Sequence, residues 1–298
     1  MASIGFIGLG LMGRAMVGRL QDRGHDLVVL GNRDRTGVEA AVARGAREAH
    51  SAKEVATHSE IVMLCMGTSE QVEARMRGPE GVIAGIEGKD DDGRSASVVI
   101  DFGTSLPGST QQLASEVAAL GAAYLDAPLG RTPAHAVDGL LNIMGAGDEA
   151  AFERVRPVLD DLGENVFHLG PSGSGHTIKL INNFFAMTTA SAMSEAFAMA
   201  DKAGIERQAL FEVMGAGPLR SGMMEFIRNY AVDGQIDLAF SVANARKDVG
   251  YYGEMAEGMG AETIMSACAR EVLSAAIEDG RGEDMVPQMV DFFAARFG

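Results

Sequence analysis

The sequence has few cysteines, few prolines and a deficit of basic residues. Cys65 and Cys268 are its only cysteines, so a disulfide framework is excluded and a reducing compartment, the cytoplasm, is expected. The net charge of -16 argues against nucleic acid as a partner, because phosphate binding needs a basic surface. No apolar run reaches about eighteen residues, and the first strand-like run begins at Ser3, so we expect neither a membrane span nor a signal peptide.

Glycine, in contrast, is abundant. The chain has 38 glycines against 8 prolines, which indicates many tight turns of the kind that α/β folds need. Its 298 residues are enough for two ordinary domains, and 47% hydrophobic with 22% charged residues is typical of a globular protein.

Residues 3–33 have the pattern of strand, glycine-rich turn, helix, turn and second strand. In this setting the G-x-G-x-x-G motif predicts a dinucleotide site. Gly8 allows the sharp turn, Gly10 lets backbone N–H groups approach a pyrophosphate, and Gly13 lets helix and strand pack closely. The predicted cofactor-binding turn also includes the residues between these glycines, Leu9, Leu11 and Met12.

The rest of the chain divides at about residue 170. Before it, helical stretches separate most of the strand-like runs, which predicts a Rossmann domain with a doubly wound, mostly parallel sheet over residues 1–170. After it, a long helix over 177–203 opens an all-helical domain, residues 171–298. The polar segment 87–97 is predicted to be a loop, and the strand-like runs are 61–66, 97–101, 122–126, 140–145 and 165–169.

The end of the second strand predicts which nicotinamide cofactor binds. The residue that reads the adenosine ribose lies about twenty positions after the glycines, and an acid there selects NAD. Counting from Gly13 leads to Arg33, with no carboxylate at the strand tip. Arg33 and Arg35 can pair with a 2′-phosphate, and Asn32 and Thr36 can add polar contacts. The predicted cofactor is therefore NADP, as NADPH, with NAD as the alternative; the loop could also be merely exposed and polar.

Two common classes of dehydrogenase are excluded by what the chain lacks. Short-chain enzymes use a tyrosine four residues before a lysine, and no tyrosine here has a lysine at that position. Zinc dehydrogenases need clustered cysteine and histidine ligands, whereas the histidines here are scattered and the cysteines isolated, so no metal site is predicted.

A lysine and two amides on the long helix are the best candidates for the chemistry. Lys179, Asn182 and Asn183 are spaced at i, i+3 and i+4, which places them on one helical face after a glycine-rich turn. In a cleft, Lys179 could donate the proton for a developing alkoxide, with its pKa lowered by desolvation. The alternative is a lysine that reaches solvent while the amides bond neighbouring backbone.

Four motifs in one order resemble the β-hydroxyacid dehydrogenase family: GLGLMG, DAPLG, G-x-x-G-x-G-x-x-x-K-x-x-x-N and RKD. The resemblance implies a Rossmann domain joined by a long helix to an all-helical domain that builds a homodimer or homotetramer. It also implies metal-free interconversion of 3-hydroxy acids and semialdehydes. Lys179 matches the family's catalytic lysine and Asn183 its assisting asparagine. The implied cofactor contacts are Met66, Gly67, Thr104 and Lys247.

The chain departs from most of that family in the loop that cradles the substrate carboxylate. Gly130, Arg131 and Thr132 stand where most members have Ser-Gly-Gly, which exchanges neutral donors for a forked cation suited to multi-oxygen anions. The segments GRTPAHAVDGLL and KLINNF are similar to those of the 3-sulfolactaldehyde reductase subgroup, which would also give Asn182 a substrate role. The expected substrate is a small anionic aldehyde or its hydroxy acid, with a sulfonate head group.

Three carboxylate substrates stay open as alternatives: succinic, tartronate and methylmalonate semialdehyde. A different class is a cofactor-binding protein without catalysis, such as a redox sensor or scaffold. The presence of both Lys179 and Asn183 argues against that class.

Overall fold

The computed structural model describes residues 1–32, 34–88 and 95–298. By their internal contacts the residues form two compact units, Met1–Lys179 and Leu180–Gly298. The boundary falls inside one continuous helix, α9 (Ser174–Lys202).

Among the described residues of the first unit, six strands form a parallel sheet in the order β3-β2-β1-β4-β5-β6. The order reverses direction between β1 and β4, as in a doubly wound sheet that binds a ligand at that point. The predicted fold is confirmed, although β3 is a short edge strand that the sequence pattern did not indicate. The strands are β1 (Ser3–Ile7), β2 (Asp26–Leu30), β3 (Arg47–Ala49), β4 (Ile61–Leu64), β5 (Val98–Asp101) and β6 (Ala123–Asp126).

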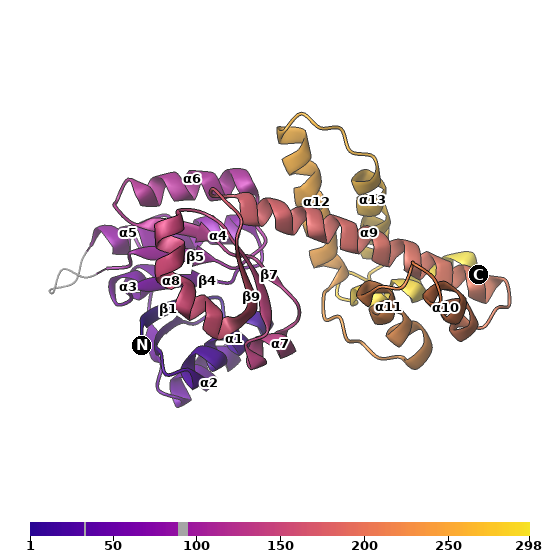
Figure 1. Cartoon of the computed structure of the whole chain (residues 1–298), viewed down its shortest axis with the longest axis horizontal. Coiled ribbons are helices and arrows are strands. Elements are labelled where there is room, and N and C mark those ends of the chain that lie inside the picture. Colours follow the sequence, from indigo (N-terminus) through magenta and orange to yellow (C-terminus); the bar gives the residue numbers. More distant parts are fainter. Residues whose placement is uncertain (33, 89–94) are drawn as a thin grey trace. The chain divides into compact units, whose positions relative to one another are not determined.

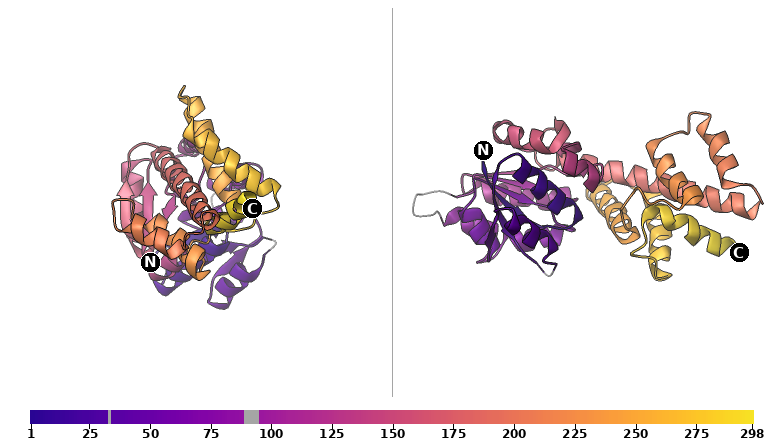
Figure 2. Two further views of the ribbon diagram at one scale, coloured as in Figure 1. Left: turned by 90° about the vertical axis from the view of Figure 1, so that its right-hand side faces the viewer. Right: turned by 90° about the horizontal axis from the view of Figure 1, so that it is seen from below.

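Helices cover both faces of this sheet (Figures 1 and 2). The strands alternate their side chains between the two faces, so Ile4 and Phe6 join one hydrophobic core and Ile7 joins the other. One face carries α1 (Leu11–Asp22), α2 (Thr36–Ala43), α7 (Pro133–Asp138) and α8 (Glu149–Leu162). The other carries α3 (Ala52–Thr57), α4 (Ser69–Met76), α5 (Val82–Glu87) and α6 (Pro107–Ala118).

A second, three-stranded sheet holds β7 (Leu129–Gly130), β8 (Leu141–Gly145) and β9 (Gly163–His168). The predicted strands at 140–145 and 165–169 exist, but they pair here and not in the parallel sheet. β7 and β8, which are joined through α7, pair antiparallel, whereas β8 and β9, which are joined through α8, pair parallel.

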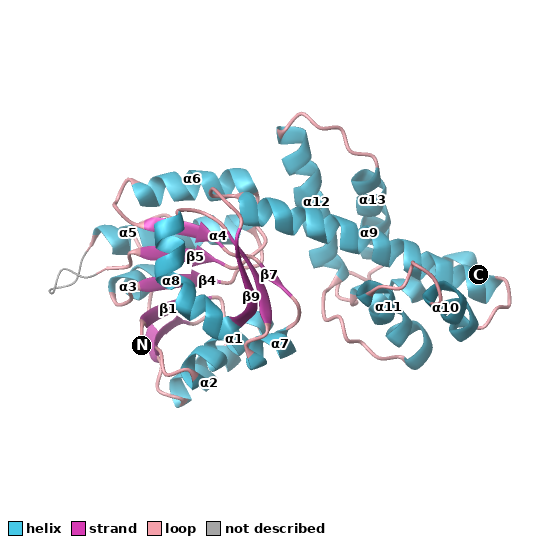
Figure 3. Ribbon diagram, in the orientation of Figure 1, coloured by secondary structure: helices cyan, strands magenta, loops and turns pink. Residues whose placement is uncertain are grey.

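The second unit is helical, as Figure 3 shows. Its core brings apolar residues of α9 together with those of the later helices, for example Phe197 and Phe293. The predicted all-helical domain is therefore confirmed. None of the described helices is long and apolar enough to cross a membrane. After α9 the helices are α10 (Arg207–Gly215), α11 (Gly222–Asp233), α12 (Val242–Gly258), α13 (Met265–Glu278), the 3-10 turn η1 (Val286–Gln288) and α14 (Met289–Phe297).

Candidate active site

The glycine turn between β1 and α1 is built so that two of its glycines cannot be replaced. Gly8 has φ +99°, and a Cβ there would lie 2.3 Å from the Cys65 carbonyl oxygen. A Cβ on Gly13 would lie 1.9 Å from the Gly8 carbonyl oxygen. A Cβ on Gly10, in contrast, would meet no described atom within 4 Å, so the turn opens toward free space beside Gly10.

The amino end of α1 fits the phosphates of a dinucleotide. Gly10 is its N-cap and receives no side-chain cap from the described residues, and Leu11 is exposed. The first N–H groups of a helix have no partner within the helix and attract anions. The space that a Cβ on Gly10 would occupy is where a pyrophosphate could approach them, so these residues fit NAD(P).

Two further loops meet the glycine turn at the same edge of the sheet. A Cβ on Gly8 would lie 2.9 Å from Met66 Sδ, and a Cβ on Gly103 would lie 3.0 Å from the Met66 carbonyl oxygen. The loops after β1, β4 and β5 therefore touch, and the structure brings Thr104 and Gly67 to the predicted cofactor edge. The Gly67 N–H donates to Gln71 Oε1 at 3.1 Å.

The structure describes the loop predicted to select the cofactor except at Arg33. Asn32 is exposed after β2, whereas Arg33 lies outside the described residues. The Asp34 carboxylate accepts from the Thr36 N–H at 2.9 Å, and this backbone hydrogen bond lowers the pKa of Asp34. Arg35 forms a two-pronged ion pair with Glu48 on β3, at 2.6 and 2.9 Å.

Two buried aspartates hold the functional loops, although no role was predicted from the sequence for either of them. Asp101 and Asp126 end β5 and β6, and their register pairs them side by side. Asp101 accepts from the Gly103 N–H at 2.8 Å and from Ser105 Oγ at 2.9 Å, which fixes the Thr104 loop. The sequence does contain an indication of these roles, because both predicted strands end in aspartate before a loop that contains glycine or proline.

Asp126 fixes the start of the helix that carries the candidate lysine. Its carboxylate accepts from the Gly173 N–H at 2.8 Å and from the His176 N–H at 2.9 Å. Gly175 lies so close that a Cβ would be 2.2 Å from the Met144 carbonyl oxygen. One turn further, Lys179 Nζ donates to the Leu129 carbonyl oxygen at 2.6 Å. The structure thus brings Lys179 to β7, directly before the predicted substrate loop.

The predicted substrate loop has an unusual backbone at its arginine. Among the described non-glycine residues, Arg131 alone has a positive φ, +76°. Its Nη1 donates to the Leu140 carbonyl oxygen at 2.6 Å and to Glu164 Oε2 at 2.5 Å. Thr132 follows as the N-cap of α7. The guanidinium is thus held partly by an acid of its own chain.

A second cluster of predicted residues lies in the helical unit. Asn183 Nδ2 donates to the buried carboxylate of Asp248 at 2.6 Å, and Lys247 Nζ lies 2.9 Å from the other oxygen of that carboxylate. Asn182 Nδ2 donates to Asn183 Oδ1 at 3.1 Å. Asp248, the last residue of the RKD motif, therefore orients both Asn183 and Lys247, a role that the motif alone did not indicate.

The charge of Asp101 acts on two titratable groups, the half-buried Cys65 and the buried Tyr124. Burial, followed by the charge of Asp101, raises the pKa of the Cys65 thiol to about 12. The same two causes, in the same order, raise the pKa of Tyr124 well above its usual value. Both side chains are therefore neutral at ordinary pH and serve as packing or hydrogen-bonding groups. Among the described residues, no three or more His, Cys, Asp or Glu side chains are grouped so that they could hold a metal ion.

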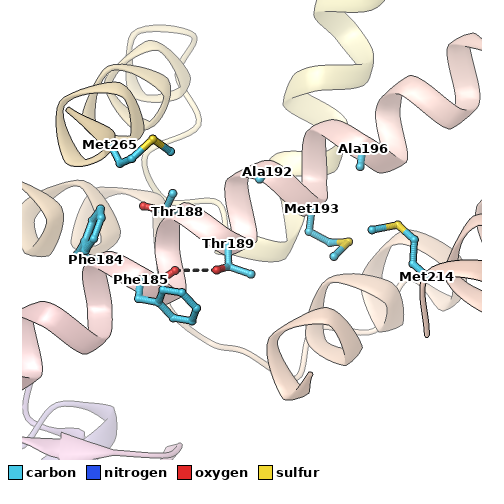
Figure 4. A pocket seen from close by; sticks show the side chains of 9 residues that line it. All are labelled: Phe184, Phe185, Thr188, Thr189, Ala192, Met193, Ala196, Met214 and Met265. Carbon is cyan, nitrogen blue, oxygen red and sulfur yellow. Dashed lines mark hydrogen bonds between the residues drawn. The ribbon is translucent and has the colours of Figure 1, made fainter. Parts of the chain in front are cut away.

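An apolar groove of about 440 Å³ lies in the helical unit. Figure 4 shows its lining along α9, closed by Met214 of α10 and Met265 of α13. Phe185 is 71% exposed there although it is a large aromatic side chain. The part of the lining that α9 supplies is Phe184, Phe185, Thr188, Thr189, Ala192, Met193 and Ala196.

Comparison with known families assigns the class that this fold and turn define. Residues 3–170 match the family described as the NAD binding domain of 6-phosphogluconate dehydrogenase. Residues 173–293 match the family described as NAD-binding of NADP-dependent 3-hydroxyisobutyrate dehydrogenase. The chain is an NAD(P)-dependent oxidoreductase, and it belongs to the β-hydroxyacid dehydrogenase family.

Individual relatives agree with that assignment. The chain is 30% identical to 2-(hydroxymethyl)glutarate dehydrogenase of Eubacterium barkeri, over 95% of this chain and 92% of that protein. It is 29% identical to 3-sulfolactaldehyde reductase of Escherichia coli, with the same coverage. The solved structure of Mycobacterium tuberculosis 3-hydroxyisobutyrate dehydrogenase with L-serine has a TM-score of 0.85 at 25% identity, over 98% of this chain and 99% of that one. The predicted reaction class, a small acidic semialdehyde and its 3-hydroxy acid, is confirmed.

Proposed function

We propose that Lys179 is the proton donor for aldehyde reduction and that Asn183 assists it from the next turn of α9. The observation that carries this proposal is the contact of Lys179 Nζ with the Leu129 carbonyl oxygen, at 2.6 Å. That contact holds an ammonium two residues before Arg131. When bound, NADPH supplies the hydride to the aldehyde carbon, and Lys179 gives its proton to the alkoxide oxygen that forms.

We propose that the loop of Gly130, Arg131 and Thr132 binds the anionic end of the substrate, with Asn182 as a further contact. A guanidinium offers forked donors to a multi-oxygen anion, which favours a sulfonate head group. One relative is named a 3-sulfolactaldehyde reductase, which supports this choice. A carboxylate semialdehyde, such as the succinic, tartronate or methylmalonate compound, is the second candidate, and the relative named for 2-(hydroxymethyl)glutarate supports it.

Kinetics on two aldehydes separate these candidates. We would measure kcat/KM for 3-sulfolactaldehyde and for succinic semialdehyde in the wild type and in Arg131→Ala. The sulfonate proposal expects a loss for 3-sulfolactaldehyde that exceeds the loss for succinic semialdehyde by more than about tenfold, or about 1.4 kcal/mol. Equal losses would favour the carboxylate, and no loss for either would remove Arg131 from substrate binding.

We propose that the cofactor is NADP and that Arg33, with Asn32, binds its 2′-phosphate. The pairing of Arg35 with Glu48 supports Arg33 as the cation at this position. Arg33→Asp should shift the ratio of kcat/KM for NADPH over NADH by at least about tenfold toward NADH, because an acid there accepts from the ribose hydroxyls. Arg44→Asp, an exposed change at the far end of α2, is the control. An unchanged ratio would refute the assignment.

The remaining cofactor contacts are proposed from position in the chain. The glycine turn would hold the pyrophosphate, and the loops after β4 and β5 would touch the nicotinamide half. Lys247, oriented by Asp248, would add a cation. Besides Lys247, these residues are Gly8, Leu9, Gly10, Leu11, Met12, Gly13, Met66, Gly67 and Thr104.

We propose that residues 171–298 build a homodimer, or a dimer-based tetramer, and that a second copy covers the α9 groove. The exposed Phe185 and the small side chains of Thr189 and Ala192 would let another helix approach closely. Phe185→Glu should convert the assembly to monomers in size-exclusion chromatography with light scattering. The control is Val137→Glu, which changes an exposed apolar residue of the first unit. A monomeric wild type would contradict the proposal.

A further inference from the structure

His176 is a fully buried residue in the first turn of α9 that the proposed reaction does not use. Its main-chain N–H is held by Asp126. Its ring Nδ1 lies 2.7 Å from Thr110 Oγ1 on α6. Its Nε2 has no hydrogen-bond partner among the described residues and lies 3.8 Å from Asp101 Oδ2. A buried polar atom without a partner is rare enough in native proteins to need an explanation.

The neighbours of the ring determine where its proton lies. The Thr110 hydroxyl can donate its one proton to Nδ1, at 2.7 Å, or to the Leu106 carbonyl oxygen, at 3.2 Å. If Nδ1 held the ring proton, the lone pair of Nε2 would face the buried Asp101 carboxylate, and the two would repel. With the proton on Nε2, an N–H points at the carboxylate and Nδ1 accepts from Thr110. The second arrangement is the more stable one.

Asp101 is the carboxylate that fixes the Thr104 loop, through the Gly103 N–H and Ser105 Oγ. His176 lies three residues before Lys179 on the same helix. The ring of His176 therefore lies between Asp101, which holds the Thr104 loop, and the helix α9, which carries Lys179. The gap of 3.8 Å is too long for a hydrogen bond, and a movement of about 1 Å closes it.

We propose that His176 is a positioning residue: through Nε2 and Asp101 it sets the Thr104 loop against the helix turn that carries Lys179. The inference rests on the proposed roles of Lys179 and Thr104. A misplacement of about 1 Å between reacting groups can lower the rate on the order of 10²-fold, so this link acts on turnover more than on substrate affinity.

Two amide substitutions separate the two ends of the ring. In His176→Gln the amide nitrogen reaches the position of Nε2, whereas in His176→Asn it reaches only the position of Nδ1. Thr110→Val is the matched control, because it removes the partner of Nδ1 and leaves Nε2 in place. We would measure kcat and KM for the semialdehyde, together with the melting temperature, of each full-length variant.

The proposal expects kcat to fall by at least about tenfold in His176→Asn but by less than about threefold in His176→Gln and Thr110→Val, with aldehyde KM nearly constant. Equal kcat for the Asn and Gln variants, or losses that follow the melting temperature alone, would overturn it. A measurement on the wild type needs no variant to fold: nitrogen NMR shifts should report the imidazole proton on Nε2. A proton on Nδ1 would also overturn the proposal, because Nε2 could not then donate to Asp101.

A binding experiment separates failure of this inference from failure of the proposed function. The Kd of NADPH and that of adenosine 2′,5′-bisphosphate, which lacks the nicotinamide half, are measured by fluorescence or calorimetry. In His176→Asn the Kd of NADPH should rise by about threefold or more while that of the bisphosphate stays constant, since only the nicotinamide half meets the Thr104 loop. This result does not depend on the role of Lys179. An unchanged Kd for both ligands would contradict the link even if Lys179 proves to be the proton donor.

Discussion

Arg131 Nη1 and Glu164 Oε2 lie 2.5 Å apart, although 33 residues separate them in the chain. Glu164 belongs to β9, and Arg131 follows β7 with a backbone conformation that normally suits glycine. A non-glycine residue in this region costs roughly 1–3 kcal/mol, and residues with such strain cluster at active and ligand-binding sites. The pair therefore presents the proposed substrate arginine already bound to an anion of its own chain.

This pairing predicts that Glu164 competes with the substrate. In Glu164→Gln the KM for an anionic semialdehyde should fall by up to about fivefold with kcat little changed, because an exposed ion pair is worth about 0.2–1 kcal/mol. Glu153→Gln, an exposed acid that pairs with Arg156, is the control and should leave KM unchanged. A KM that rises in Glu164→Gln would mean that Glu164 orients Arg131 for binding and does not compete.

Substitution of Gly175 by a residue with a Cβ should lower the stability of the fold. In Gly175→Ala the new Cβ would meet the Met144 carbonyl oxygen at 2.2 Å and Asp126 Oδ2 at 2.9 Å, and backbone cannot move aside cheaply. The free energy of unfolding in urea should drop by about 1–3 kcal/mol or more. Gly108→Ala, in a helix of the same unit where a Cβ meets no described atom within 4 Å, should be neutral or slightly stabilising. Equal stability of the two variants would contradict the packing described for Gly175.

The two cysteines should differ in reactivity. Burial and the charge of Asp101 raise the pKa of Cys65 to about 12, whereas Cys268 is exposed. At about pH 8 a disulfide reagent should react with one thiol in the native wild type and with none in native Cys268→Ser, because the thiolate is the reactive form. After unfolding, one additional thiol should react in each of the two proteins. A fast second thiol in the native wild type would show that Cys65 is accessible.

The raised pKa of Cys65 also makes the stability of the fold depend on pH. The pKa of Cys65 is about 12 in the folded chain, above the ordinary thiol value of 9.0, so its contribution to stability is complete below about pH 9. That contribution is lost as pH rises from about 9 through 12, because the unfolded chain ionises first. Tyr124, with a raised pKa of its own, acts in the same direction. Unfolding midpoints should therefore fall in this alkaline range, and less so in Cys65→Ala.

Local patterns were enough to predict much of the fold. Gly8 and Gly10 follow a buried strand, and Gly13 lies in the first turn of an amphipathic helix, so the spacing of the three glycines is seen in the structural context that it predicts. The long helix was predicted over 177–203, and α9 begins three residues earlier because Asp126 holds the N–H groups of Gly173 and His176. That contact joins segments about fifty residues apart, which helical periodicity does not report.

The parts that sequence did not predict depend on such distant contacts. The strands β3 and β7 have three and two residues, too short for an alternating pattern. The roles of Asp101, Asp126 and Asp248 as anchors follow from backbone N–H groups and side chains brought in from other elements. Arg131 was predicted to hold an anion, but its pairing with Glu164 appears only when β7 and β9 share one sheet.

The proposed reaction is tested most directly by the initial rate of NADPH oxidation with a panel of small acidic semialdehydes, compared between the wild type and Lys179→Ala. We expect the wild type to consume NADPH with at least one of them and Lys179→Ala to be slower by about 10²–10⁴-fold, since this is the usual contribution of a general acid. The Kd of NADPH should stay within about threefold, because Lys179 is not proposed to bind the cofactor. A wild type that oxidises NADPH with none of these aldehydes would contradict the proposed reaction, and a Lys179→Ala variant with normal turnover would contradict the proposed role of Lys179.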